Sequence, residues 1–235
     1  MPERVPARHD LAWLDRDAAG AARLAAPACI AEREAQALLA DWLRRGHPLI
    51  VTSQPAGVEA PTELRLGLAL PPAQGKRRLA FFIPRRSVQA LTPPPALADA
   101  APALPLRWQP ALLALQSMAA VAACAPRVYG SAAIQVSTGE ACLGDDSDLD
   151  LLLAPTDWNA ALAACAALAE FASGCGLRVD GEIRNARGHA TAWRELAGRP
   201  GRLLVKGDAG ATLLALADFA AGFAAAPLRQ ERQAA

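Results

Sequence analysis

One stretch constrains the fold of this chain more than any other: residues 127–153, RVYGSAAIQVSTGEACLGDDSDLDLLL. It opens with a short apolar run at residues 127–129 and then breaks at Gly130-Ser131. A short helix and a polar loop are predicted to follow, and a second apolar run at residues 148–153 predicts another strand. We therefore expect two strands joined through a short helix, with a glycine-containing turn between the first strand and the helix.

The second of these strands carries two acidic residues, Asp148 and Asp150. Side chains alternate along a strand, so both carboxylates are expected on the same face. Neighbouring carboxylates repel each other unless a cation lies between them, and Mg²⁺ is a hard ion that binds oxygen and leaves positions open for phosphate. We predict that both are catalytic metal ligands for Mg²⁺, with Mn²⁺ as an alternative ion. The competing interpretation is a pair of edge charges that discourage pairing with other sheets.

The turn before the helix suits phosphate. Glycine allows the backbone to approach a ligand closely, and the helix that follows directs free N–H groups and its positive dipole end toward an anion. We therefore predict that Gly130 and Ser131 bind phosphate oxygens beside the metal. A Gly-Ser turn followed by Asp-x-Asp resembles the nucleotidyltransferase superfamily typified by DNA polymerase beta, although the 16 residues between Ser131 and Asp148 exceed its usual spacing.

Four further residues are candidates for substrate binding. Asp180 and Glu182 lie in a predicted strand at residues 177–183 and share one face, so either can serve as a third carboxylate of the site. Arg194 and Lys206 are candidates for neutralising phosphate charge. For all four the alternative is a solvated strand residue.

The fold class predicted is α+β, with a mixed sheet flanked by helices in the second half. In the first half, an amphipathic helix is expected at residues 30–45 and strands at residues 49–52, 63–70 and 77–83. In the second half, helices are expected at residues 109–124, 156–171 and 211–223, a returning hairpin strand at 191–194 and a strand at 202–206. Prolines from Pro84 to Pro105 are expected to block regular pairing and to mark a boundary. The expected divisions are an N-terminal α+β module (1–88), a Pro-rich connection (89–107), a nucleotidyltransferase-like catalytic domain (108–225) and a polar tail (226–235).

Composition narrows the setting. The chain has 235 residues, 53% hydrophobic, enough for a sizeable core, and its net charge of +1 gives no argument for nucleic acid or membrane as a partner. Five cysteines without a C-x-x-C pair indicate reduced thiols, and the three histidines are too scattered for a metal cluster. No signal peptide and no apolar run long enough for a membrane helix are evident, so a cytoplasmic location is expected.

Several short motifs along the chain belong together. They are His9-Asp10-Leu11, residues 65–71 (RLGLALP), residues 127–131 (RVYGS), residues 147–152 (SDLDLL), Asp180-Gly181-Glu182, residues 192–196 (AWREL) and residues 204–206 (LVK). In this combination the whole chain resembles the MdcG family, the phosphoribosyl-dephospho-CoA transferases that act as holo-acyl-carrier-protein synthases of malonate decarboxylase. The chain departs from the family pattern at Ala132-Ala133, where a larger helix start with an aromatic residue is usual.

The resemblance implies a reaction. The donor would be triphosphoribosyl-dephospho-CoA, the acceptor a serine of the acyl-carrier subunit of malonate decarboxylase, and the second product diphosphate. Asp148 and Asp150 would hold Mg²⁺, and Gly130 and Ser131 would hold the leaving diphosphate. The N-terminal module, which shows no catalytic constellation, would dock the carrier or enclose the CoA tail. The alternatives are a nucleotidyltransferase with another small-molecule, protein or RNA acceptor, and a non-catalytic module, against which the intact Asp148–Asp150 pair argues.

Overall fold

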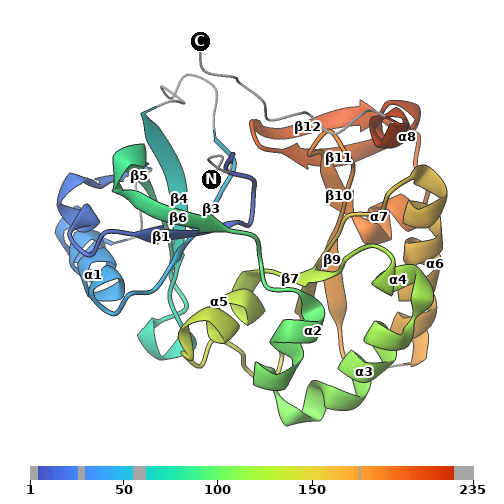
Figure 1. The fold of residues 1–235 in the computed structure, drawn as a ribbon, viewed down its shortest axis with the longest axis horizontal. Helices are drawn as coiled ribbons and strands as arrows, with labels where there is room; N and C mark the ends of the chain where they lie inside the picture. The colour runs from blue at the N-terminus through green and yellow to red at the C-terminus, as the bar shows by residue number, and fades with distance from the viewer. Residues whose placement is uncertain (1–4, 26–29, 55–61, 175, 225–235) are drawn as a thin grey trace.

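Two six-stranded sheets, one in each half of the chain, organise the molecule. The computed structural model describes residues 5–25, 30–54, 62–174 and 176–224. Figure 1 shows the two sheets in separate lobes that lie side by side, with the first half of the chain in one lobe and the second half in the other. The α+β class predicted from the sequence is confirmed.

The sheet of the first lobe has the strand order β2-β5-β4-β3-β1-β6, and all of its pairs are antiparallel. Its elements are β1 (Leu11–Leu14), β2 (Arg23–Leu24), α1 (Glu32–Arg44), β3 (Leu49–Val51), β4 (Glu63–Ala69), β5 (Arg78–Pro84) and β6 (Val88–Thr92), with short 3₁₀ turns at Ala18–Ala21, Pro72–Gln74 and Arg85–Ser87. The apolar positions of α1 recur at helical spacing, so Leu39, Trp42 and Leu43 are buried on the side that faces the sheet.

Strand β4 separates its two faces with a period of two. Leu64, Leu66 and Leu68 are buried in the core that α1 covers, whereas the residues between them point to the opposite side. One face of this sheet is therefore core, and the other is turned toward the second lobe, where it lines the cleft described below.

The sheet of the second lobe has the order β12-β11-β10-β9-β8-β7. Its strands are β7 (Arg127–Val128), β8 (Leu149–Leu153), β9 (Val179–Arg184), β10 (Ala190–Ala192), β11 (Arg202–Gly207) and β12 (Gly210–Ala215). The helices are α2 (Leu97–Ala100), α3 (Gln109–Ser117), α4 (Ala119–Ala122), α5 (Gly130–Thr138), α6 (Trp158–Gly174), α7 (Trp193–Ala197) and α8 (Leu216–Ala224), with 3₁₀ turns at Ala101–Ala103 and Leu106–Trp108. Strands β8 and β9 are parallel and the other pairs antiparallel, which confirms the predicted mixed sheet.

The Pro-rich connection differs from the prediction. Prolines were expected to block pairing from Pro84 to Pro105, but residues 88–92 form β6, which pairs with β1 at the edge of the first sheet. These five residues contain no proline, and the prolines at Pro84 and residues 93–95 only limit the strand's ends.

Three other predicted elements in the second half are wrong. The helix expected at residues 109–124 is broken at Met118, whose backbone is extended. Trp193 and Arg194 begin α7 and do not continue the hairpin strand. Residues 211–215, expected in the last helix, form β12, because pairing along all of β11 outweighs the helix propensity of an alanine- and leucine-rich run. The predicted polar tail lies outside the described residues.

Helix α5 connects the two lobes. Ala132 packs in the core of the second lobe, whereas Ile134, two residues on, packs with Cys142 in the core of the first. Figure 1 shows α5 near the junction of the lobes. Within the described residues, no helix has the length and apolar character needed to cross a bilayer.

Candidate active site

The glycine of the Gly-Ser turn lies against one of the acidic residues. Gly130 has a φ of +65° and begins α5, and the N–H of the preceding residue, Tyr129, donates to the carbonyl of Asp150 (3.1 Å). A Cβ added to Gly130 would lie 2.3 Å from Oδ2 of Asp150. The glycine is therefore required both by the backbone conformation and by the close approach of Asp150.

Three aspartates gather near this turn. Strand β8 places Asp150 directly opposite Asp180 of β9 in the parallel register. Burial, and then the charges of Asp148 and Asp180, raise the pKa of Asp150 from its ordinary 3.8 to about 6. Asp148, just before β8, directs Oδ2 toward Nη2 of Arg178 (3.2 Å), and Oδ1 of Asp180 accepts from the N–H of Gly181 (2.9 Å).

These aspartates suit a divalent cation by the type of donor atom they offer and not by their spacing. In the described part of the chain, no three His, Cys, Asp or Glu side chains converge closely enough to form a metal cluster. However, burial first, and then the charges of Asp148 and Asp180, disfavour the ionised form of Asp150, and carboxylate oxygens are the donors that Mg²⁺ prefers. The donor chemistry of these aspartates therefore fits such an ion, and a metal at this site stays a prediction.

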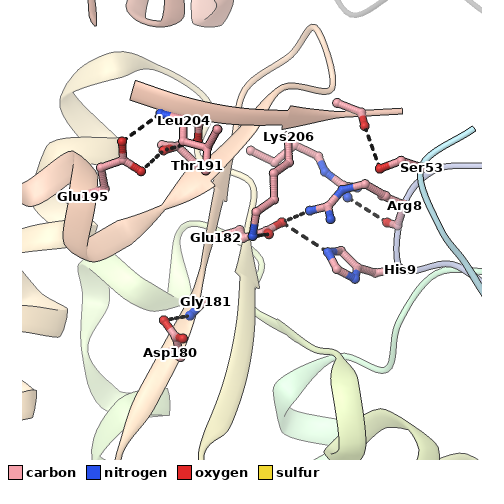
Figure 2. A network of polar contacts seen from close by, with 12 residues as sticks. Arg8, His9, Ser53, Asp180, Gly181, Glu182, Thr191, Glu195, Leu204 and Lys206 are labelled. Carbon is pink, nitrogen blue, oxygen red and sulfur yellow. Dashed lines mark hydrogen bonds and ion pairs between the residues drawn. The ribbon is translucent and has the colours of Figure 1, made fainter. Parts of the chain in front are cut away.

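Glu182 is in a different environment from Asp180, although both are on β9. Its side chain is 3% exposed and is surrounded by cations from both lobes, as Figure 2 shows. Arg8 pairs with Oε2, which also lies 3.2 Å from Nε2 of His9, and Nζ of Lys206 lies 3.1 Å from Oε1. Burial alone would raise the pKa of Glu182, but the hydrogen bond from His9 and the charge of Arg8 hold it far below its usual range.

The two candidates for a third carboxylate are thus distinguished. Both oxygens of Glu182 are already engaged by cations, whereas Asp180 is exposed and stands next to Asp150. Lys206 pairs with Glu182, and its predicted contact with phosphate stays a prediction.

Arg8 and His9 are the residues that the sequence did not assign to the site. His9 was interpreted as structural, yet it lines the cleft, adopts a φ of +75° and stacks on the ring of Tyr129 (centroids 4.1 Å apart). Burial lowers the pKa of His9. The His9-Asp10-Leu11 motif at the start of β1 was the available signal.

Arg194 lies apart from these groups. Its Nη2 donates to the carbonyl of Val179 (3.0 Å), and its guanidinium lies 4.3 Å from the ring centroid of Trp193. It is not among the residues lining the cleft, so its predicted contact with phosphate remains a prediction.

A cleft of about 600 Å³ lies between the lobes. On one side it is lined by Tyr129, Gly130 and Asp150, and on the other by the face of the first sheet that is turned away from α1, with Arg8 and His9 between them. Ser131 lines an adjoining hollow with Lys76 and Arg78 of the first lobe. The first lobe is thus a wall of the candidate site.

Comparison with known proteins gives the class and the family. Sequence models of the phosphoribosyl-dephospho-CoA transferase MdcG match both lobes: its N-terminal domain over residues 7–94 and its C-terminal domain over residues 96–217. These matches make the protein a transferase. The chain belongs to the phosphoribosyl-dephospho-CoA transferase family.

Individual relatives agree with this assignment. The chain is 38% identical over 211 residues to a phosphoribosyl-dephospho-CoA transferase of Xanthomonas campestris pv. campestris, covering 88% of this chain and 93% of the relative. It is 36% identical over 223 residues to the phosphoribosyl-dephospho-CoA transferase of Bradyrhizobium diazoefficiens, covering 94% of this chain and 95% of the relative. The corresponding transferase of Pseudomonas aeruginosa is 33% identical over 198 residues, covering 80% of this chain and 87% of the relative. No solved structure matches the chain.

Proposed function

We propose that the protein transfers the phosphoribosyl-dephospho-CoA group of triphosphoribosyl-dephospho-CoA to a serine hydroxyl of the acyl-carrier subunit of malonate decarboxylase. The serine Oγ forms a bond to the phosphorus attached to the ribose, and the bond from that phosphorus to the next phosphate breaks. The serine loses its proton and diphosphate leaves. The observation that carries this proposal is the pairing of Asp150 with Asp180 beside Gly130, in a cleft walled by the first lobe.

Reactions at phosphorus of this kind depend mainly on positioning and charge neutralisation. Asp148, Asp150 and Asp180 would hold Mg²⁺, or Mn²⁺ in its place, which when bound withdraws charge from the phosphate oxygens. Gly130 and Ser131 would donate to the leaving diphosphate from the start of α5. Glu182 would not bind the metal, because Arg8 and Lys206 already neutralise it and His9 hydrogen-bonds to it. Its role would be to hold the two lobes together around the cleft.

Tyr129 is excluded as the base that accepts the serine proton. Burial and then the charge of Glu182 raise the pKa of its hydroxyl far above the ordinary 10, so it stays protonated. An aspartate of the site, or direct activation of the hydroxyl by the metal, remains available for that step.

The test is intact-mass spectrometry of the apo acyl-carrier subunit incubated with this protein, Mg²⁺ and triphosphoribosyl-dephospho-CoA. The expected result is a gain equal to the donor less diphosphate, lost with EDTA and in Asp150→Asn. Asp218→Asn, an exposed aspartate on α8, is the matched control and should transfer normally. No mass gain in a preparation that binds Mg²⁺ and nucleotide would instead favour a nucleotidyltransferase with another acceptor.

A further inference from the structure

The wall that the first lobe contributes to the cleft has an unusual composition. Its middle consists of small residues, Gly67 and Ala69 on β4 and Ala80 on β5, while Arg65 and Arg78 stand at its two ends. The antiparallel register places Ala80 opposite Gly67 and Arg78 opposite Ala69, so these side chains share one face. The result is a low, mainly apolar floor with a guanidinium at each end.

These two arginines line the cleft, which the other described arginines of their lobe apart from Arg8 do not. Arg65 donates to Oγ1 of Thr52 (3.2 Å), and neither Arg65 nor Arg78 forms an ion pair with any described carboxylate. The arginines of this lobe that do form such pairs are Arg8, Arg23, Arg44, Arg45 and Arg77. Two guanidinium groups in a cleft that form no ion pair with a described carboxylate attract anions, and the guanidinium is suited to phosphate.

The two ends face different parts of the site. Arg78 lines both the cleft and the adjoining hollow that contains Ser131, and its charge acts on Asp150. Arg78 is paired with Ala69 of β4, and Arg65 lies four residues before Ala69 in the same strand. At the usual rise of a strand, the two arginines are therefore separated by about 13 Å along the sheet. Two arginines at this spacing along the wall suit a ligand with two separated phosphate groups, one for each guanidinium.

We propose that this wall binds the donor's dephospho-CoA portion, with the triphosphate at Arg78 and the diphosphate that joins adenosine to the pantetheine arm at Arg65. The proposal rests on the proposed function, because it takes its ligand from that reaction. In that donor the two phosphate groups are separated by two ribose rings. The floor between the arginines provides a mainly apolar surface of mostly small side chains for this middle part, with Ile50 of β3 beside Gly67. Of the two roles expected for the N-terminal module, this selects enclosure of the CoA part.

The experiment is isothermal titration calorimetry of the full-length protein with two probes, dephospho-CoA and inorganic diphosphate, both with Mg²⁺. Arg65→Gln should weaken binding of dephospho-CoA by about tenfold or more, the usual effect of losing a charged hydrogen bond, and leave diphosphate binding unchanged. Arg78→Gln should weaken diphosphate binding by a similar factor. Arg86→Gln removes an exposed arginine of the same lobe that does not line the cleft, and both affinities should stay as in the wild type.

A second variant tests the floor without changing charge. Ala80→Leu places a larger side chain between the arginines and should weaken binding of dephospho-CoA while leaving that of diphosphate unchanged. Thermal unfolding of each variant shows that the lobe is folded, so a loss of binding can be read as a local effect.

The outcomes separate this proposal from the transfer reaction. If the wild type modifies the carrier but Arg65→Gln binds dephospho-CoA within twofold of the wild type, the proposal is overturned and the reaction stands. If Arg65→Gln loses affinity but the wild type modifies no carrier, the binding site stands and the acceptor is wrong. A wild type that does not bind dephospho-CoA overturns the proposal directly.

Discussion

Replacing Asp150 by asparagine should make the metal-free protein more stable at neutral pH. The folded-state pKa of Asp150 is raised from 3.8 to about 6, so between these values the folded state binds more protons than the unfolded state. The free energy of unfolding therefore falls as the pH rises through this window and stays low at pH 7. Two pKa units correspond to about 3 kcal/mol as an upper limit, and asparagine removes this penalty because it carries no charge.

Thermal unfolding in EDTA at pH 7 measures the effect. A gain of about 1–3 kcal/mol corresponds to a rise in Tm of roughly 2–10 °C for a chain of this size. The advantage over the wild type should shrink toward pH 4, where the wild-type carboxylate is protonated. Mg²⁺ should raise the Tm of the wild type but have little effect on Asp150→Asn.

The companion variant Asp148→Asn separates burial from charge. Asp148 is 40% exposed at the side chain and faces Arg178, so its replacement should change the metal-free Tm less than that of Asp150. A variant Asp150→Asn that is less stable than the wild type in EDTA at pH 7, or that Mg²⁺ stabilises as much as the wild type, would refute this account of the carboxylates.

Three further predictions concern stability. Glu182→Gln leaves the cations Arg8 and Lys206 without their anion and should cost about 3 kcal/mol or more at pH 7. Because the carboxylate pKa is depressed, urea titrations should show this difference shrinking only below about pH 4. Gly181→Ala puts a Cβ 2.1 Å from the carbonyl of Leu151 at a φ of +151°, and should cost about 3 kcal/mol or more in the same assay and abolish carrier modification. Asp157→Ala removes the acceptor for the N–H of Ala160 at the start of α6, and should lower stability by about 1 kcal/mol with the transfer rate unchanged. A neutral Gly181→Ala, or a Glu182→Gln variant as stable as the wild type, would contradict the contacts described for these residues.

The sequence predicted the parts of the site that depend on local pattern. The break at Gly130, the helix after it and the acidic strand carrying Asp150 follow from backbone freedom and side-chain alternation, which act over a few residues. Strands β3, β4 and β5 were also predictable from local pattern, because each is a short apolar or alternating run between turn residues.

The partners of the acidic residues were not predictable, because they depend on contacts between distant segments. Asp180 and Glu182 are equivalent by spacing, and only the position of Arg8, 174 residues away in the chain, distinguishes them. The prediction of a helix at residues 211–215 was wrong for a related reason. An alanine- and leucine-rich run fits either a helix or an edge strand, and pairing with the neighbouring β11 decides between them.

The ion-pair cluster at Glu182 also bears on how the chain is completed during synthesis. Arg8 and His9 are synthesised before β6, which completes the first sheet at residue 92. The carboxylate that binds them is synthesised only later, with β9. Until β11 delivers Lys206, the growing chain has a nearly finished first lobe but an open cleft. A nascent chain therefore completes the cleft between its lobes only after β11 has been synthesised.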